Sequence, residues 1–106
     1  AQTSLAFSYL NGEGIEKNDT LAAKWFVEAA MRGDALAQDR LARLYFLGQG
    51  VTRDVEAALL WLTLAEQNGM TDDTLRSAME PEITPEIRAK VAAEIAKLDK
   101  DSASPN

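Results

Sequence analysis

The chain contains no cysteine and no histidine among its 106 residues. Without cysteine, neither a disulfide framework nor a thiolate metal site can form, and the redox compartment cannot be inferred. Without histidine, the commonest general base and the commonest zinc ligand are both missing. We therefore expect no catalytic residues, no metal site and no cofactor, and we predict that the chain is not an enzyme.

Positive charge is also scarce, because 11 lysines and arginines stand against 17 acidic residues and give a net charge of −6. Nucleic-acid binding depends on cations that neutralise phosphates, so we expect no nucleic-acid partner. The sequence has no apolar run near the roughly 20 residues of a membrane helix, and we expect no direct membrane insertion. The length suits one domain, and the apolar content of 46% indicates a folded chain.

The motif Gly-x-Gly occurs at Gly12–Gly14 and again at Gly48–Gly50, at an offset of 48 − 12 = 36 residues. The same offset aligns further identical residues in the two segments. These pairs include Leu5 with Leu41, Tyr9 with Tyr45, Trp25 with Trp61, and Gly33 with Gly69. A period of this length is typical of an array of helical hairpins. A phosphate-binding loop would need a preceding strand and a following lysine, and the sequence offers neither.

Each unit reads as a helix A, a glycine loop and a helix B. In the second unit, helix A is predicted at 35–47, with Asp34 as its N-cap and Gly48 as its left-handed end. Asp54 is predicted to cap the following helix B. The two tryptophans lie at equivalent positions in helix B, and we interpret them as core residues rather than as exposed stacking platforms.

The pattern degenerates after residue 70, where Pro81 and Pro85 interrupt the third unit. A short helix is predicted at 73–79, and a last helix begins at Pro85 with Thr84 as its cap. Its apolar stripe faces the array, as a capping helix requires. The predicted boundaries are repeat 1 at 1–34, repeat 2 at 35–70, degenerate capping helices at 71–99 (together one domain, 1–99), and a flexible tail at 100–106.

Residues 1 to about 70 resemble the Sel1-like repeat, a relative of the tetratricopeptide repeat. The resemblance rests on Leu-Ala-x-x-Tyr-x-x-Gly-x-Gly-(Ile/Val) followed by Ala-x-x-Trp, seen as LAFSYLNGEGI…AAKW and LARLYFLGQGV…AALLW. It implies an all-α fold, an α-solenoid of antiparallel helix hairpins. It also implies a protein–protein interaction scaffold of bacterial envelope, regulatory or polar-organising type, and by analogy a periplasmic or other extracytoplasmic location, with the cytoplasm as the alternative. Because Ala1 aligns with Ala37 inside helix A, we expect a C-terminal fragment of a larger protein.

In the architecture that this resemblance implies, helix A lines the concave surface. We predict that its exposed face binds a segment of another protein, with arginines for a carboxylate and apolar side chains beside them. The predicted protein-binding residues are Phe7, Asn11, Arg40, Arg43, Leu44 and Leu47. Alternatively, the leucines pack against a neighbouring helix and the arginines are merely solvated.

Three other functions were weighed against this one. A peptidoglycan- or glycan-binding module would need exposed aromatic side chains, for which Phe7 is the candidate. A purely structural cap would leave the binding surface to other repeats. The carboxylates of Asp72, Asp73, Glu80, Glu82 and Glu86 could form a calcium site or a glycosidase pair, but helix caps and loop charges explain them more simply.

Overall fold

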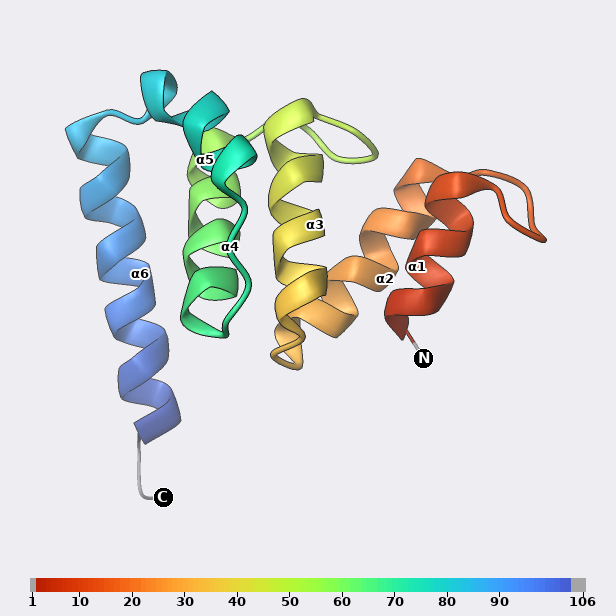
Figure 1. Cartoon of the computed structure of the whole chain (residues 1–106). Coiled ribbons are helices and arrows are strands. Elements are labelled where there is room, and N and C mark those ends of the chain that lie inside the picture. The colour runs from red at the N-terminus through yellow and green to blue at the C-terminus, as the bar shows by residue number, and fades with distance from the viewer. Residues whose placement is uncertain (1, 104–106) are drawn as a thin grey trace.

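The computed structural model of the protein describes residues 2–103, and the side chains of residues 3–98. This part of the chain folds into helices joined by short loops (Figure 1). The elements are α1 Gln2–Asn11, α2 Asp19–Met31, α3 Ala35–Leu47, α4 Val55–Gln67, α5 Asp73–Met79, the 3₁₀ helix η1 Glu80–Glu82, and α6 Pro85–Ala103. The predicted all-α class is confirmed.

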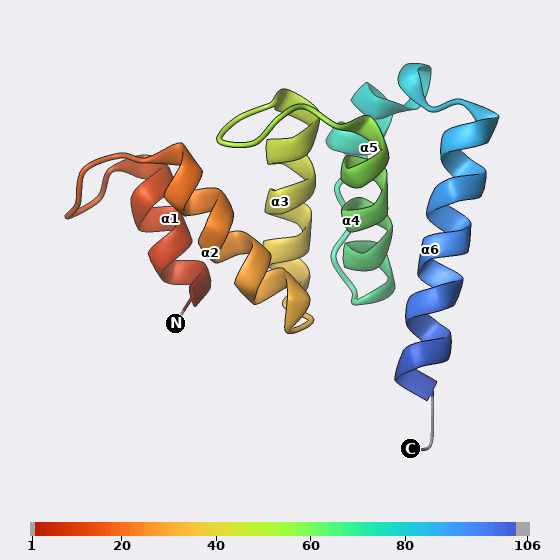
Figure 2. The same cartoon turned by 180° about the vertical axis from the view of Figure 1, so that it is seen from behind.

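Helices α1 and α2 form one antiparallel hairpin, and α3 and α4 form the next. The two hairpins stand side by side, and α6 packs against α4 at the other end of the array (Figures 1 and 2). Helices α1, α3 and α5 face the viewer in Figure 1, whereas α2 and α4 come forward in Figure 2. The extents of 40 × 39 × 22 Å fit two layers of helices. The predicted α-solenoid of helix hairpins is therefore confirmed.

Short polar side chains begin the helices, as predicted. Asn18, Asp34 and Asp54 each accept a hydrogen bond from the backbone N–H three residues on, at 3.0 to 3.1 Å. Each cap satisfies one of the N–H groups that a helix start leaves free. Gly48 ends α3 with φ +70°, a left-handed conformation that glycine adopts cheaply.

Two cores hold the layers together, one formed by α1, α2 and α3 and the other by α3, α4, α5 and α6. The largest fully buried side chains are Phe26, Leu41, Leu62 and Met79. Trp25 and Trp61 pack at the margin of the cores and keep part of their surface exposed. The tryptophans thus close the edges of the core, and the residues that follow them, Phe26 and Leu62, fill its centre.

The third unit departs from the repeat. Its helix α5 has seven residues, and the segment before it spans residues 68–72, whereas residues 32–34 suffice between α2 and α3. Thr84 Oγ1 accepts from Ile87 N at 3.1 Å and begins α6, as predicted. Helix α6 then continues to Ala103, so the segment 100–103 is helical rather than part of a flexible tail. The rest of the predicted tail, 104–106, lies outside the described residues.

Candidate functional site

The six residues predicted to bind a partner line one groove between α1 and α3, with a volume of about 300 Å³. We call this the α1–α3 groove. Its lining consists of Phe7, Leu10 and Asn11 from α1, Arg40, Arg43, Leu44 and Leu47 from α3, and Gln49 from the loop that follows. Leu10 and Gln49 complete the lining and were not predicted. The structure brings the six side chains together, while their role in binding stays a prediction.

The apolar wall of the groove combines fixed and accessible side chains. Phe7 packs edge-on against the buried ring of Phe26, with centroids 5.1 Å apart and an interplanar angle of 90°. Leu44 is only 3% exposed and belongs to the core, so it forms the floor of the groove. Leu47, by contrast, is 66% exposed at the open end. The alternative interpretation, in which the two leucines pack against a neighbouring helix, is therefore correct for Leu44 and wrong for Leu47.

The two arginines of the groove are held by acidic neighbours rather than simply solvated. Arg43 Nε donates to Asp72 Oδ2 at 2.8 Å, and Arg43 Nη2 forms an ion pair with the same oxygen at 2.7 Å. Arg40 Nη1 lies 3.5 Å from Asp39 Oδ2, and its guanidinium lies over the Phe7 ring at 5.7 Å from the centroid. Both side chains keep accessible surface, 34% for Arg40 and 42% for Arg43. They can therefore still meet a partner's carboxylate at the rim.

Asp39 lies behind these arginines and was not among the predicted residues. It is 2% exposed, and its Oδ1 is buried with no hydrogen-bond partner. Burial, together with the hydrogen bond and charge of Asp72, raises the pKa of Asp39 from 3.8 to about 6, against the lowering effect of Arg43 and Arg40. Burial also acts to raise the pKa of Asp72, but the Leu75 N–H, Asp39 and Arg43 lower it on balance. The pair therefore holds one proton and one negative charge at pH values between the lowered pKa of Asp72 and the raised pKa of Asp39.

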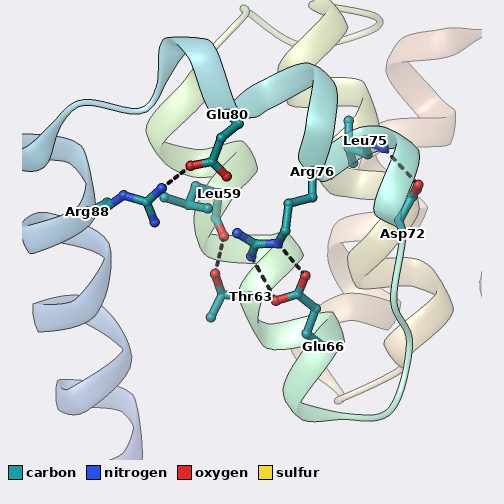
Figure 3. A network of polar contacts seen from close by, with 8 residues as sticks. All are labelled: Leu59, Thr63, Glu66, Asp72, Leu75, Arg76, Glu80 and Arg88. Carbon is teal, nitrogen blue, oxygen red and sulfur yellow. Dashed lines mark hydrogen bonds and ion pairs between the residues drawn. The ribbon is translucent and has the colours of Figure 1, made fainter.

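A second cavity, of about 480 Å³, lies between α4 and α6. Arg76 and Arg88 line it, and each is already paired: Arg76 with both carboxylate oxygens of Glu66 at 2.7 and 2.8 Å, and Arg88 with Glu80 (Figure 3). The first pair links α5 to α4, and the second links α6 to η1. We interpret this cavity as space left by the shortened third unit, because α5 is too short to cover α4 as α3 covers α2.

Three of the acidic residues after residue 70, Asp72, Glu80 and Glu82, act as a cap or as ion-pair partners. Asp72 Oδ1 accepts from Leu75 N at 3.0 Å and begins α5. Glu82 pairs with Arg53 through both oxygens at 2.8 and 2.7 Å. Among the side chains of residues 3–98, no group of three or more potential ligands could hold a metal ion. Over residues 2–103, no helix combines the length and apolar character of a membrane span.

Comparison with known proteins identifies the repeats. A sequence model of the Sel1 repeat matches residues 1–34 and 35–70, the two hairpins described above. The chain belongs to the Sel1 repeat family. No match is found among curated proteins. The degenerate third unit lies outside the matched residues.

Two solved structures share this Sel1 fold. One is a protective antigen present in uropathogenic Escherichia coli strains, described as displaying an SLR fold, with 31% identity and a TM-score of 0.80. The match covers 87% of this chain and 20% of that protein. The other is a Sel1 repeat protein from Oxalobacter formigenes, with 33% identity, a TM-score of 0.64, and 74% and 31% of the two chains covered. The chain thus spans less than a third of either relative.

Sel1 repeats typically mediate protein–protein interaction and are generally non-catalytic scaffolds. Their hairpins present helix A in a row, so that one continuous surface forms across neighbouring repeats. In this chain, the surface where two A helices meet is the α1–α3 groove.

Proposed function

We propose that the chain is a non-enzymatic interaction module whose α1–α3 groove binds a segment of a partner protein. The segment carries an apolar side chain next to a carboxylate. The apolar side chain lies against Leu47 and Leu10, and the carboxylate meets Arg40. The observation that carries the proposal is that one groove collects an exposed leucine, an aromatic edge and two accessible guanidinium groups from both repeats.

The electrostatics of the groove favour a carboxylate over a cation. Arg40, Arg43 and Asp72 together carry one net positive charge when Asp39 is protonated, although the whole chain carries −6. A guanidinium fork donates two parallel hydrogen bonds to a carboxylate, which fixes the orientation of the ligand. An ammonium group would instead meet two like charges.

The test uses a peptide display library selected on the wild-type chain. The proposal predicts that the enriched peptides carry a large apolar residue next to Asp, Glu or a free C-terminus. The variant Arg40→Gln with Leu47→Ser should then bind the selected peptides at least about tenfold more weakly, because it removes one charged and one apolar contact. Arg43 is left intact because it also holds Asp72.

A matched control removes the same chemistry outside the groove. Arg32→Gln with Met31→Ser also deletes one arginine and one exposed apolar side chain, since Met31 is 73% exposed at the end of α2. Peptide affinity should stay at the wild-type level in this control. Equal loss in both variants would reject the groove as the binding site.

The second part of the proposal concerns the cellular setting of the chain. We propose an extracytoplasmic role within a larger bacterial envelope, regulatory or polar-organising protein, supported by family analogy and by one relative being described as a protective antigen. Fractionation of the host cell with an antibody against this chain tests it, and recovery in the cytoplasm alone would reject it. A glycan-binding role is the weaker candidate, because Arg40 covers one side of the Phe7 ring.

A further inference from the structure

One hydroxyl hydrogen bond links helix α1 to the N-cap of helix α3, the two A helices of the first two repeats. Thr3 Oγ1 of α1 donates to Asp34 Oδ2 at 2.6 Å. The other oxygen of Asp34 accepts from Ala37 N at 3.1 Å and caps α3. A helix-A side chain of one repeat therefore donates to the carboxylate that caps helix A of the next repeat.

The next junction has the same arrangement with a different donor. The 36-residue period places Asp39 where the first repeat has Thr3, since 3 + 36 = 39. The capping carboxylate is now Asp72, whose Oδ1 accepts from Leu75 N at 3.0 Å. Asp39 and Asp72 meet the same guanidinium, because Arg43 lies 3.7 Å from Asp39 Oδ2 and 2.7 Å from Asp72 Oδ2. Asp39 can donate to the neighbouring carboxylate of Asp72 only if it carries a proton. The unpartnered Oδ1 of Asp39 is the atom that such a proton would satisfy.

The charged groups that act on Asp39 come from two elements. Its own helix contributes Arg40 Nη1 at 3.5 Å and Arg43 Nε at 3.7 Å, both measured to Asp39 Oδ2. The segment before α5 contributes Asp72, which already holds Arg43 at 2.7 Å. Any change in the charge of Asp39 is therefore felt by both arginines of the α1–α3 groove.

We propose that protonation of Asp39 sets the net charge of the α1–α3 groove and thereby its affinity for a carboxylate ligand. This inference rests on the binding function proposed above. With its proton, Asp39 donates to Asp72 as Thr3 donates to Asp34, and the groove keeps one net positive charge for a partner's carboxylate. Without the proton, Asp39 neutralises that charge and draws Arg40 and Arg43 inward. Binding of a carboxylate ligand then tightens as the pH falls. The raised pKa of Asp39, about 6, places this change between pH 5 and 7.

The proton site is tested first by NMR on the whole chain, with carboxyl ¹³C and guanidinium ¹⁵N signals followed from pH 4 to 8. One aspartate should titrate near pH 6, and the Arg40 and Arg43 signals should shift with the same midpoint. In Asp39→Asn, whose amide can donate to Asp72 at every pH, that titration should disappear. Asp39→Thr, which copies the first junction, should behave in the same way. Titration of every aspartate below pH 5 in the wild type would overturn the proposal.

The link to binding uses N-acetyl-leucine, a probe that joins one apolar side chain to one carboxylate. Its dissociation constant for the wild type should fall on the order of five- to tenfold between pH 7.5 and 5, as expected for one nearby unit charge after solvent screening. Asp39→Asn should bind with the wild-type pH 5 affinity at both pH values. A wild-type pH dependence retained in Asp39→Asn would overturn the control. Absence of probe binding at every pH, with Asp39 still titrating near 6, would instead refute the binding function of the groove.

Discussion

Replacing Gly50 by alanine tests whether the two repeats stack closely. Gly50 follows α3, has φ +78°, and lies against the first residue of α2. A Cβ at this position would lie 2.3 Å from the carbonyl oxygen of Asp19 and 2.6 Å from its carbonyl carbon. Both atoms belong to the backbone of the preceding repeat. An alanine can therefore be accommodated only if the two repeats separate locally.

The first repeat supplies a matched control for this substitution. Gly14 is the equivalent glycine, with φ +77°, and a Cβ there would meet nothing within 4 Å. Both alanines pay the cost of a left-handed backbone, about 1–2 kcal/mol. Gly50→Ala adds the cost of overpacking, typically about 1–3 kcal/mol. We therefore expect losses of about 1–2 kcal/mol for Gly14→Ala and about 2–5 kcal/mol for Gly50→Ala.

Thermal unfolding followed by far-ultraviolet circular dichroism measures both variants. One kcal/mol corresponds to a shift of about 4–8 °C in a domain of this size. Gly50→Ala should thus unfold at a midpoint at least about 4 °C below that of Gly14→Ala. Equal midpoints would show that the loop of the second repeat does not press on α2, and the described stacking would be wrong.

Three further predictions concern the core, the helix caps and the buried carboxylate. Phe26→Ala should cost about 3–5 kcal/mol in urea unfolding, and Trp25→Ala should cost less because its ring is only partly buried; the reverse order would contradict the described core. Asp34→Ala and Asp54→Ala should each lower the free energy of unfolding by on the order of 1 kcal/mol. The loss should be larger for Asp34→Ala, because only Asp34 also accepts a hydrogen bond from Thr3. Equal losses would show that the Thr3–Asp34 hydrogen bond does not stabilise the chain. The folded-state pKa of Asp39 is raised, so its contribution to the free energy of unfolding is complete below about pH 4. This contribution, at most about 3 kcal/mol, is lost as the pH rises through 6. Asp39→Asn should therefore be more stable than the wild type at pH 7.5 and similar to it at pH 4, and a less stable variant at pH 7.5 would refute this sign.

The repeat period made most of the fold predictable from the sequence. Helix A of the second unit begins at Ala35 and ends at Leu47, as predicted, because a capping aspartate and a left-handed glycine mark its two ends. The end of α6 was less predictable. Its last residues are polar, and no glycine or proline interrupts the sequence before Pro105. The helix therefore continues beyond the predicted boundary at residue 99.

The repeat pattern does not predict how equivalent positions differ in solvent exposure. Ile15 and Val51 align, yet Ile15 is 38% exposed whereas Val51 packs on the core of the first repeat. The loop of the second repeat packs on the first repeat, at Asp19. The exposure of a loop residue therefore depends on its neighbour and cannot be read from its own unit.

That the six residues line one groove was predictable because they share one face of helix A, whose orientation the family resemblance implies, although Leu44 on that face is buried. The place of Asp39 beside the groove could not be predicted in this way. Its neighbour Asp72 lies in the segment 68–72, which departs from the 36-residue period. That segment is two residues longer than its counterpart after α2, so the capping aspartate falls at residue 72 and not at residue 70, which the 36-residue period would give. The alignment of Asp39 with Thr3 was the signal that could have revealed a donor position.

The binding surface is tested most directly by chemical-shift mapping of a library-selected peptide on the ¹⁵N-labelled chain. We predict that the largest perturbations fall on Phe7, Leu10 and Leu47, at the α1–α3 groove. Perturbations confined to Val91 and Ile95, in the larger cavity between α4 and α6, would contradict this prediction and move the binding site to the capping helix.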